Sequence, residues 1–116
     1  MAKSTISESA LPPRTRKLLE TLGDNLRIAR MRRGMTEVEM ADRMMVSRQT
    51  LRRLEAGDPS VGLRILGSAL HVLGLSDDLA LLADPSRDQQ GLVRDRTRAK
   101  ARQQSNEPDP SRDLKF

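Results

Sequence analysis

The chain has 116 residues, of which 21 are Lys or Arg and 16 are Asp or Glu, and its formal net charge is +5 at pH 7. It contains no cysteine, which excludes disulfides and thiolate metal sites, and no apolar run long enough for a transmembrane span or a secretion signal. These properties predict a cytoplasmic protein with one small domain, and they favour a polyanionic partner over a membrane.

The positive charge is unevenly distributed along the chain. Residues 14–34 contain seven basic and two acidic groups, whereas residues 36–57 contain four of each. Residues 58–84 contain one basic and four acidic groups, and residues 85–116 contain eight basic and five acidic groups. The beginning of the domain and the tail are therefore the basic regions.

Residues 1–13 are rich in Ser and Thr and end in two prolines, which predicts a flexible N-terminal arm. A helix is expected from about Arg14 to Gly34, where glycine takes the left-handed position that ends a helix. Apolar residues recur along it at spacings of three and four, as one face of a helix requires. These are Leu18, Leu19, Leu22, Leu26 and Ala29.

Two short helices joined by a tight turn are predicted in residues 36–57. Thr36 and, three residues later, Glu39 form the pattern of a capping box at the start of the first helix. Ser47 is the expected N-cap of the second helix, which ends at Gly57. The turn between them contains Met45 and Val46, and Leu51 and Leu54 are expected to point into the core.

Two further helices complete the predicted domain. The first begins near Ser60 and stops at Gly74, and the second is capped by Ser76 and runs to about Ala83. No segment has the alternating pattern of a β-strand. The expected fold is therefore all-α, with five helices packed in a domain over residues 14–85.

The remaining residues, 86–116, are charged and poor in aliphatic side chains. Residues 89–104 are able to form a helix transiently, but such a helix would have almost no apolar surface to bury. We therefore expect a C-terminal tail that is mostly disordered when the protein is alone.

The second helix of the pair in residues 36–57 carries Arg48, Gln49, Arg52 and Arg53. Two helices at a steep angle let the second helix enter the DNA major groove, where Arg and Gln bind base edges. The alternative to DNA binding is that residues 36–57 form an ordinary αα-hairpin whose arginines are only a solvated surface.

The residues around this pair sharpen the interpretation. They are Leu22-Gly23, Leu26-Arg27, Arg30, Gly34-Met35-Thr36, Met40-Ala41, Val46-Ser47, Thr50-Leu51, Glu55 and Gly57. With this spacing the chain resembles the phage repressor and Cro family of helix-turn-helix domains, often called the Xre family. The resemblance covers residues 20 to about 83 and implies a five-helix DNA-binding domain.

The resemblance also implies roles for individual residues. Arg30 and Glu55 would form a partly buried ion pair that supports the structure, although two solvated surface charges are the alternative. Base reading would come from Arg48 and Gln49, with Arg53 one turn later. The residues implied in phosphate contact or positioning are Ser47, Thr50, Arg43, Arg27, Arg52 at the groove edge, and Glu37.

Three positions depart from the family pattern. Glu37 stands where the family usually has Gln, and a carboxylate facing phosphate is repelled, so Glu37 is expected to pair with Arg48 or to serve the helix N-terminus. Met45 replaces the usual turn glycine, which costs about 1–2 kcal/mol if it is held left-handed. The loop Ala56-Gly57-Asp58 lacks the usual Asn and basic residues. Together these changes predict weaker or differently angled DNA contact.

The expected function is that of a sequence-specific regulator of double-stranded DNA, a repressor acting as a homodimer on two half-sites. The dimer surface is expected on the last predicted helix, unless its leucines only close the core. These leucines are Leu75, Leu79, Leu81 and Leu82.

A second function is an antitoxin role. The small size, the basic tail and the acidic stretch 77–84 are similar to those of HipB-like antitoxins, which repress their own operon and bind a kinase-like toxin. The tail is equally suited to be a non-specific DNA-binding arm, because basic residues alternate with other residues along it. They are Arg94, Arg96, Arg98, Lys100 and Arg102.

Enzymatic chemistry is not expected. The sequence has no Gly-rich phosphate loop, no Ser/His/Asp set and no carboxylate pair in a plausible cleft. His71 stands alone and is expected at the surface or at a helix end. We therefore predict that the protein has no enzymatic activity and binds no cofactor or metal. As a DNA-binding protein it is expected to be associated with the nucleoid.

Overall fold

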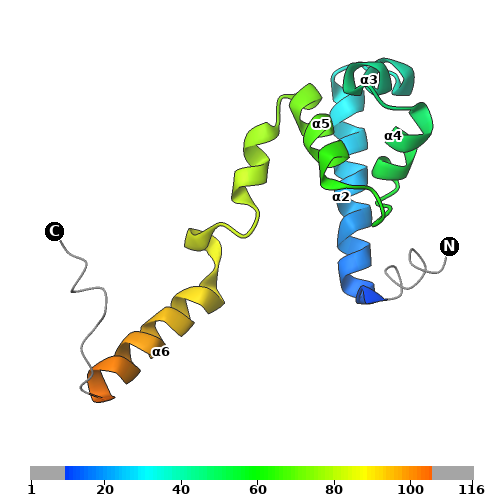
Figure 1. Ribbon diagram of the computed structural model, residues 1–116. Coiled ribbons are helices and arrows are strands. Elements are labelled where there is room, and N and C mark those ends of the chain that lie inside the picture. The colour runs from blue at the N-terminus through cyan, green and yellow to red at the C-terminus, as the bar shows by residue number, and fades with distance from the viewer. Residues whose placement is uncertain (1–9, 106–116) are drawn as a thin grey trace. The chain divides into compact units, whose positions relative to one another are not determined.

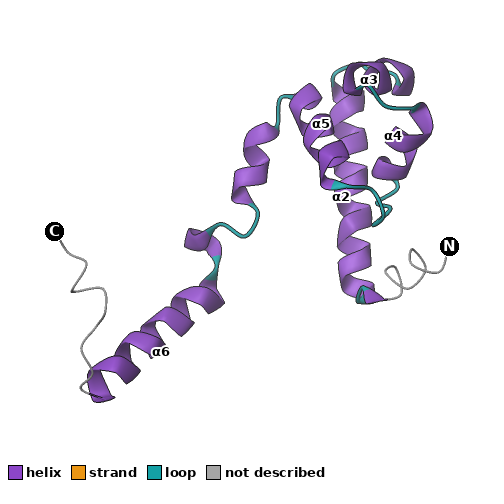
Figure 2. Ribbon diagram, viewed as in Figure 1, coloured by secondary structure: helices purple, strands orange, loops and turns teal. Residues whose placement is uncertain are grey.

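The computed structural model describes residues 10–105. Within this range the chain is helical and has no strand, so the predicted all-α class is confirmed (Figure 2). The α-helices, labelled in Figure 1, are α2 (Pro13–Arg32), α3 (Glu37–Met44), α4 (Arg48–Glu55), α5 (Leu63–Leu73) and α6 (Gln89–Ser105). Two 3₁₀ helices, η1 (Ser76–Leu81) and η2 (Pro85–Arg87), lie between α5 and α6 in the sequence.

Two compact units divide the chain after Leu79. The first contains α2 to α5 and the beginning of η1, and the second contains the end of η1, η2 and α6. The domain predicted over residues 14–85, with an arm before it and a tail after it, stays a prediction. Residues 1–9 of that arm and residues 106–116 of that tail lie outside the described residues.

The core of the first unit lies among α2, α3, α4 and α5. Methionine and aliphatic side chains fill it, because no aromatic residue is present before the chain end. Full burial of each large side chain contributes about 1.5–3 kcal/mol to stability. The buried apolar residues are Leu26, Met35, Met40, Ala41, Met44, Leu51, Leu54, Ile65, Ala69, Leu70 and Leu73.

Local hydrogen bonds set the starts of the two short helices as predicted. The N–H of Glu39 donates to Oγ1 of Thr36 at 3.1 Å, and the N–H of Thr36 donates to Oε1 of Glu39 at 3.3 Å. The N–H of Thr50 donates to Oγ of Ser47 at 3.0 Å. The capping box and the second N-cap are therefore confirmed, and α3 and α4 begin where the sequence placed them.

The turn between α3 and α4 contains a strained residue. Met45 adopts a left-handed conformation with φ 58° and ψ 40°. The condition stated for Met45 is therefore met, and its left-handed conformation costs about 1–2 kcal/mol. The Met45 side chain is 90% exposed, so its burial does not offset this cost.

Two glycines allow α2 to approach the end of α4. A Cβ atom at Gly23 would lie 2.5 Å from the carbonyl oxygen of Glu55, and one at Gly57 would lie 2.6 Å from the carbonyl oxygen of Leu19. Gly57 also has φ +76°, which side chains rarely adopt. The two backbones therefore meet where no side chain fits, and this contact fixes α4 against α2.

Arg33, just after α2, holds the end of α5. Its Nε–H donates to the carbonyl oxygen of Leu73 at 3.1 Å, and its Nη1 donates to that of Ala29 at 2.7 Å. A cation at the carboxyl end of a helix binds unpaired carbonyls and complements the helix dipole. Arg33 thereby links the ends of two core helices.

The last predicted helix differs from the expectation. Residues Ser76–Leu81 form a 3₁₀ helix with no buried residue. Leu75 packs against the core, but Leu79, Leu81 and Leu82 are 39%, 49% and 68% exposed. These three leucines therefore do not belong to the buried apolar core of the described residues.

In the second unit, residues 89–105 form α6, where the sequence predicts a mostly disordered tail. Asp88 caps the helix, since the N–H of Gly91 donates to its Oδ1 at 2.9 Å. None of the residues 89–104 is buried. The cap at Asp88 therefore gives the helix a defined start. Between residues 10 and 105 no helix has both the length and the apolarity to cross a membrane.

Candidate nucleic-acid interface

Helix α4 has one buried face and one exposed face. Leu51, Leu54 and Glu55 are buried. Because successive residues turn by about 100° around a helix, four other side chains of α4 point away from the core. They are Arg48, Gln49, Arg52 and Arg53, all of them exposed. The four long polar side chains of α4 that were predicted to contact DNA therefore share its outer face.

A buried ion pair attaches α4 to α2. The Nε–H of Arg30 donates to Oε2 of Glu55 at 2.8 Å, and Nη2 donates to Oε1 at 3.1 Å. The side chains of Arg30 and Glu55 are only 9% and 7% exposed. Arg30 also donates to the carbonyl oxygen of Met35 at 3.0 Å. The hydrogen bond to Glu55 raises the pKa of Arg30, so the guanidinium stays charged, and the ion pair holds the end of α4 against α2.

Glu37 at the start of α3 lies against two arginines of α4. Its Oε2 accepts from Nε of Arg52 at 2.7 Å and from Nε of Arg48 at 3.4 Å. The hydrogen bond from Arg52 is the main reason why the pKa of Glu37 is lowered, with Arg48 adding to it. The pairing with Arg48 was anticipated from the sequence, but the shorter contact, with Arg52, was not.

Arg53 faces the loop after α4. Its Nε–H donates to Oδ2 of Asp58 at 2.9 Å, and its Nη2 donates to Oγ of Ser60 at 2.5 Å. Asp58 also accepts from the N–H of Ser60 at 2.9 Å and from its hydroxyl at 2.7 Å. The Ser60 hydroxyl first, then its N–H and Arg53, lower the pKa of Asp58. Arg53 therefore has a structural partner, which the sequence did not indicate.

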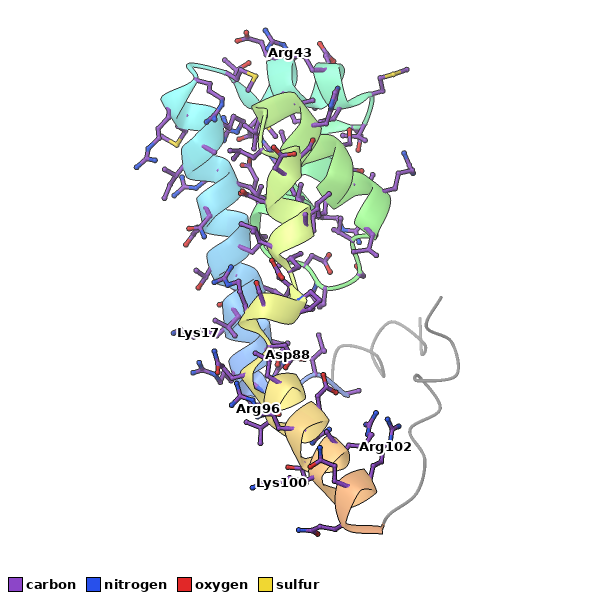
Figure 3. The ribbon with its side chains drawn as sticks, turned by 90° about the vertical axis from the view of Figure 1, so that its left-hand side faces the viewer. Lys17, Arg43, Asp88, Arg96, Lys100 and Arg102 are labelled. Atoms are coloured by element: carbon purple, nitrogen blue, oxygen red, sulfur yellow. The ribbon has the colours of Figure 1, made fainter. Side chains whose placement is uncertain are left out.

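The remaining predicted residues fall into two groups. Ser47 and Thr50 lie at the start of α4, with their hydroxyl oxygens 2.8 Å apart, so both are engaged in the cap. Gln49, Arg27 and Arg43 are exposed on α4, α2 and α3 respectively. Figure 3 shows Arg43 at the α3 end of the first unit, with Lys17 toward the other end of α2. The structure thus gathers the α4 residues and Glu37, while Arg27 and Arg43 lie on separate helices.

An apolar groove of about 210 Å³ lies beside this interface. It runs between α2, the loop after α4 and the start of α5, and Asp58 is the one titratable residue along it. Its apolar lining includes Leu19, Leu22, Leu54, Val61, Leu63 and Leu66. Among residues 10–105 no group of three or more His, Asp or Glu side chains is arranged to hold a metal ion. The groove therefore offers mainly hydrophobic contact.

Comparison of the sequence with models of known protein families identifies the family of this domain. Residues 21–82 match the family model of a helix-turn-helix domain, which is more than half of the chain. The chain belongs to this helix-turn-helix domain family. No curated protein matches it. The helix-turn-helix domain includes all the residues predicted to contact DNA, from Arg27 to Arg53, and its partner is DNA.

Proposed function

We propose that this helix-turn-helix protein is a sequence-specific transcriptional regulator without enzymatic activity, which represses genes in the manner of the Xre family. The observation that carries the proposal is the exposed face of α4. Arg48 and Gln49 lie at its start, where a recognition helix contacts bases. The buried ion pair of Arg30 and Glu55 attaches the opposite, buried face of α4 to α2.

The roles of the α4 residues follow from their chemistry. Arg binds guanine through O6 and N7, and Gln binds adenine through N6 and N7, each discriminating by about 1–3 kcal/mol. We assign Arg48 and Gln49 to base reading. Ser47 and Thr50, beside them at the helix start, are suited to phosphate contacts that set the position of the helix.

Arg53 was predicted to read bases, but its contacts favour a different role. With Asp58 and Ser60 bound at 2.9 and 2.5 Å, its guanidinium is directed to the loop after α4. Base reading by Arg53 would require these contacts to open. We therefore propose that Arg53 mainly anchors the loop that follows the recognition helix.

Glu37 and Arg52 form the positioning element of the proposed interface. The carboxylate of Glu37 accepts a hydrogen bond from Nε of Arg52 and so restrains its guanidinium. The same carboxylate repels phosphate, so it weakens sequence-independent attraction to DNA. We propose that Glu37 orients Arg52 and thereby favours correct sites over random DNA.

A homodimer is the proposed binding form. Helix α4 has eight residues and offers few base contacts, so a specific site requires two half-sites about 34–36 Å apart. The exposed leucines Leu79, Leu81 and Leu82 provide an apolar surface for a second copy.

Quantitative binding to the DNA upstream of its own gene, at about 150 mM salt and against a scrambled competitor, tests this function. Selective protection of two half-sites is the expected result. Equal affinity for both DNAs, with the protein folded, would overturn the proposal of a sequence-specific regulator.

An antitoxin role is the second candidate. The exposed leucines Leu79, Leu81 and Leu82 lie in the acidic stretch 77–84, and they would suit a different protein as well as a second copy. Co-expression with a kinase-like protein encoded beside this gene, followed by size-exclusion chromatography, distinguishes the two. A stable complex that is lost in Leu81→Asp/Leu82→Asp favours the antitoxin role. A homodimer that does not bind the kinase-like protein would exclude the antitoxin role.

A further inference from the structure

Helix α6 has a charge pattern that the helix-turn-helix domain does not use. Residues 94–102 contain five cationic residues and one acidic residue, Asp95, which gives a net charge of +4. All of these side chains are exposed. The cationic residues are Arg94, Arg96, Arg98, Lys100 and Arg102.

The cations form two opposite edges of the helix. With 3.6 residues per turn, Arg94, Arg98 and Arg102 fall within about 80° of one another, and Arg96 and Lys100 within about 40°. The centres of these two groups are about 180° apart. Figure 3 shows Arg96 and Lys100 on one side of α6 and Arg102 on the other.

This pattern does not stabilise an isolated helix. Cations four residues apart repel each other, and three such pairs occur, Arg94–Arg98, Arg98–Arg102 and Arg96–Lys100. Leu92 and Val93 are 37% and 56% exposed, so apolar burial gives little compensation. A polyanion that contacts both edges would neutralise the repulsion and favour the helical form.

The two edges fit the major groove of duplex DNA. That groove is about 12 Å wide, and a helix with its side chains is about 10–12 Å across, so phosphates flank a helix in the groove on both sides. An anionic membrane would instead require an apolar face along the helix. Leu92 and Val93 are the aliphatic residues of α6 larger than alanine, and both lie in its first turns.

We propose that α6 is a second DNA-binding element, which lies in the major groove with Arg94, Arg98 and Arg102 facing the phosphates of one strand and Arg96 and Lys100 facing those of the other. This contact extends the proposed DNA binding by α4, but it is independent of the residues of α4. It adds affinity without base preference, because the groups that it uses contact phosphates.

Two charge-matched variants of the full chain test the proposal. Arg94→Gln/Arg98→Gln and Arg96→Gln/Lys100→Gln each remove two cations four residues apart, from opposite edges. Binding to a random-sequence duplex is measured as a function of salt, where each neutralised phosphate contributes about 0.9 to the slope of log affinity against log salt. Each variant is expected to reduce this slope by about two, and the fourfold variant by about four.

A third variant tests whether the helix itself is needed. Thr97→Pro keeps every charge but breaks α6, since proline removes a helical hydrogen bond and clashes with the preceding turn. It is expected to weaken binding to the random duplex about as much as one charge pair does, and to lose the DNA-induced gain in helical circular dichroism. Unchanged binding by Thr97→Pro would overturn the proposal.

Other outcomes also overturn it. A loss confined to one charge pair would show contact on a single edge. Charge-dependent binding to phosphatidylserine vesicles but not to the duplex would make α6 a membrane element.

All measurements are repeated in Arg48→Ala/Gln49→Ala, where the α6 effect should persist. If the α6 effect is absent while sequence preference is intact, only this inference fails. If sequence preference is absent while the α6 effect is intact, only the proposed function fails.

Discussion

The Nε–H of Arg52 in α4 donates to Oε2 of Glu37 in α3 across 2.7 Å, so an anion of α3 lies beside the cations of the proposed recognition helix. Arg48 shares the same oxygen at 3.4 Å. One carboxylate thus neutralises part of the charge of two arginines. The consequence is a recognition surface that is less attractive to random DNA than its arginine content suggests.

Removing this charge should weaken discrimination. We expect Glu37→Gln to increase affinity for random duplex and to steepen its salt dependence by about one unit of slope. Affinity for the specific site should rise less, so the ratio between the two should fall. Fluorescence anisotropy with both DNAs measures this ratio.

Glu39→Gln is the matched control, because Glu39 lies at the same end of α3 but accepts from the N–H of Thr36 and not from an arginine. If Glu39→Gln changes the ratio as much as Glu37→Gln does, the effect comes from net charge and the positioning role of Glu37 is wrong.

Base preference should depend on the start of α4. Arg48→Ala and Gln49→Ala are each expected to relax preference at one position of the site, by about 1–3 kcal/mol, with the fold intact. Arg53→Ala should leave preference nearly unchanged, because its guanidinium binds Asp58 and Ser60. Selection from a randomised duplex library measures all three. A uniform loss on every sequence would make Arg48 and Gln49 phosphate contacts.

The buried pair of Arg30 and Glu55 should be sensitive to the loss of one partner. Glu55→Gln or Arg30→Met leaves an uncompensated buried charge and should cost about 3–5 kcal/mol of unfolding free energy. The double variant Arg30→Met/Glu55→Leu should recover part of that loss. Urea unfolding measures these values. A loss below about 1 kcal/mol would show that the pair behaves as a solvated one.

Stability should fall in acid because of Glu37 and Asp58. Arg52 first lowers the pKa of Glu37, and Ser60 first lowers that of Asp58. The unfolded chain then binds more protons, so this stability is present above the ordinary pKa of about 4 and is lost as pH falls through the lower folded-state values.

Thermal unfolding between pH 7 and pH 3 measures the acid effect. Asp58→Asn should lose stability at neutral pH and show a weaker decline below about pH 4 than the unaltered protein. Asp42→Asn, at an exposed position of α3, is the control and should follow the unaltered protein. Identical declines in both variants would exclude Asp58 as a source of the acid sensitivity.

The close approach of α2 and α4 should make Gly23 intolerant of a side chain. Gly23→Ala places a Cβ within 2.8 Å of three backbone atoms and should cost about 1–3 kcal/mol. Gly62→Ala, where no atom lies within 4 Å of the added Cβ, is the control and should cost far less. Equal effects in urea unfolding would contradict the steric explanation.

The sequence by itself determined the local features of the fold. The caps at Thr36 and Ser47 and the left-handed Gly34 depend on residues within four positions of each other, so their patterns are visible in the sequence. The set of polar residues on α4 was predictable for the same reason, since helical periodicity alone separates it from Leu51 and Leu54. The pairing of Arg30 with Glu55 followed from a family resemblance and not from periodicity.

Only the tertiary structure decided which charges meet. Glu37 and Arg52 lie on different helices, and the crossing of α3 and α4 makes Arg52 a closer partner than Arg48. The 3₁₀ form of residues 76–81 was likewise not visible, because the same spacing of leucines suits either helix type. Ion-pair distances and backbone contacts depend on how helices cross, and the crossing is fixed by the packing of the whole core, which no local pattern of residues encodes.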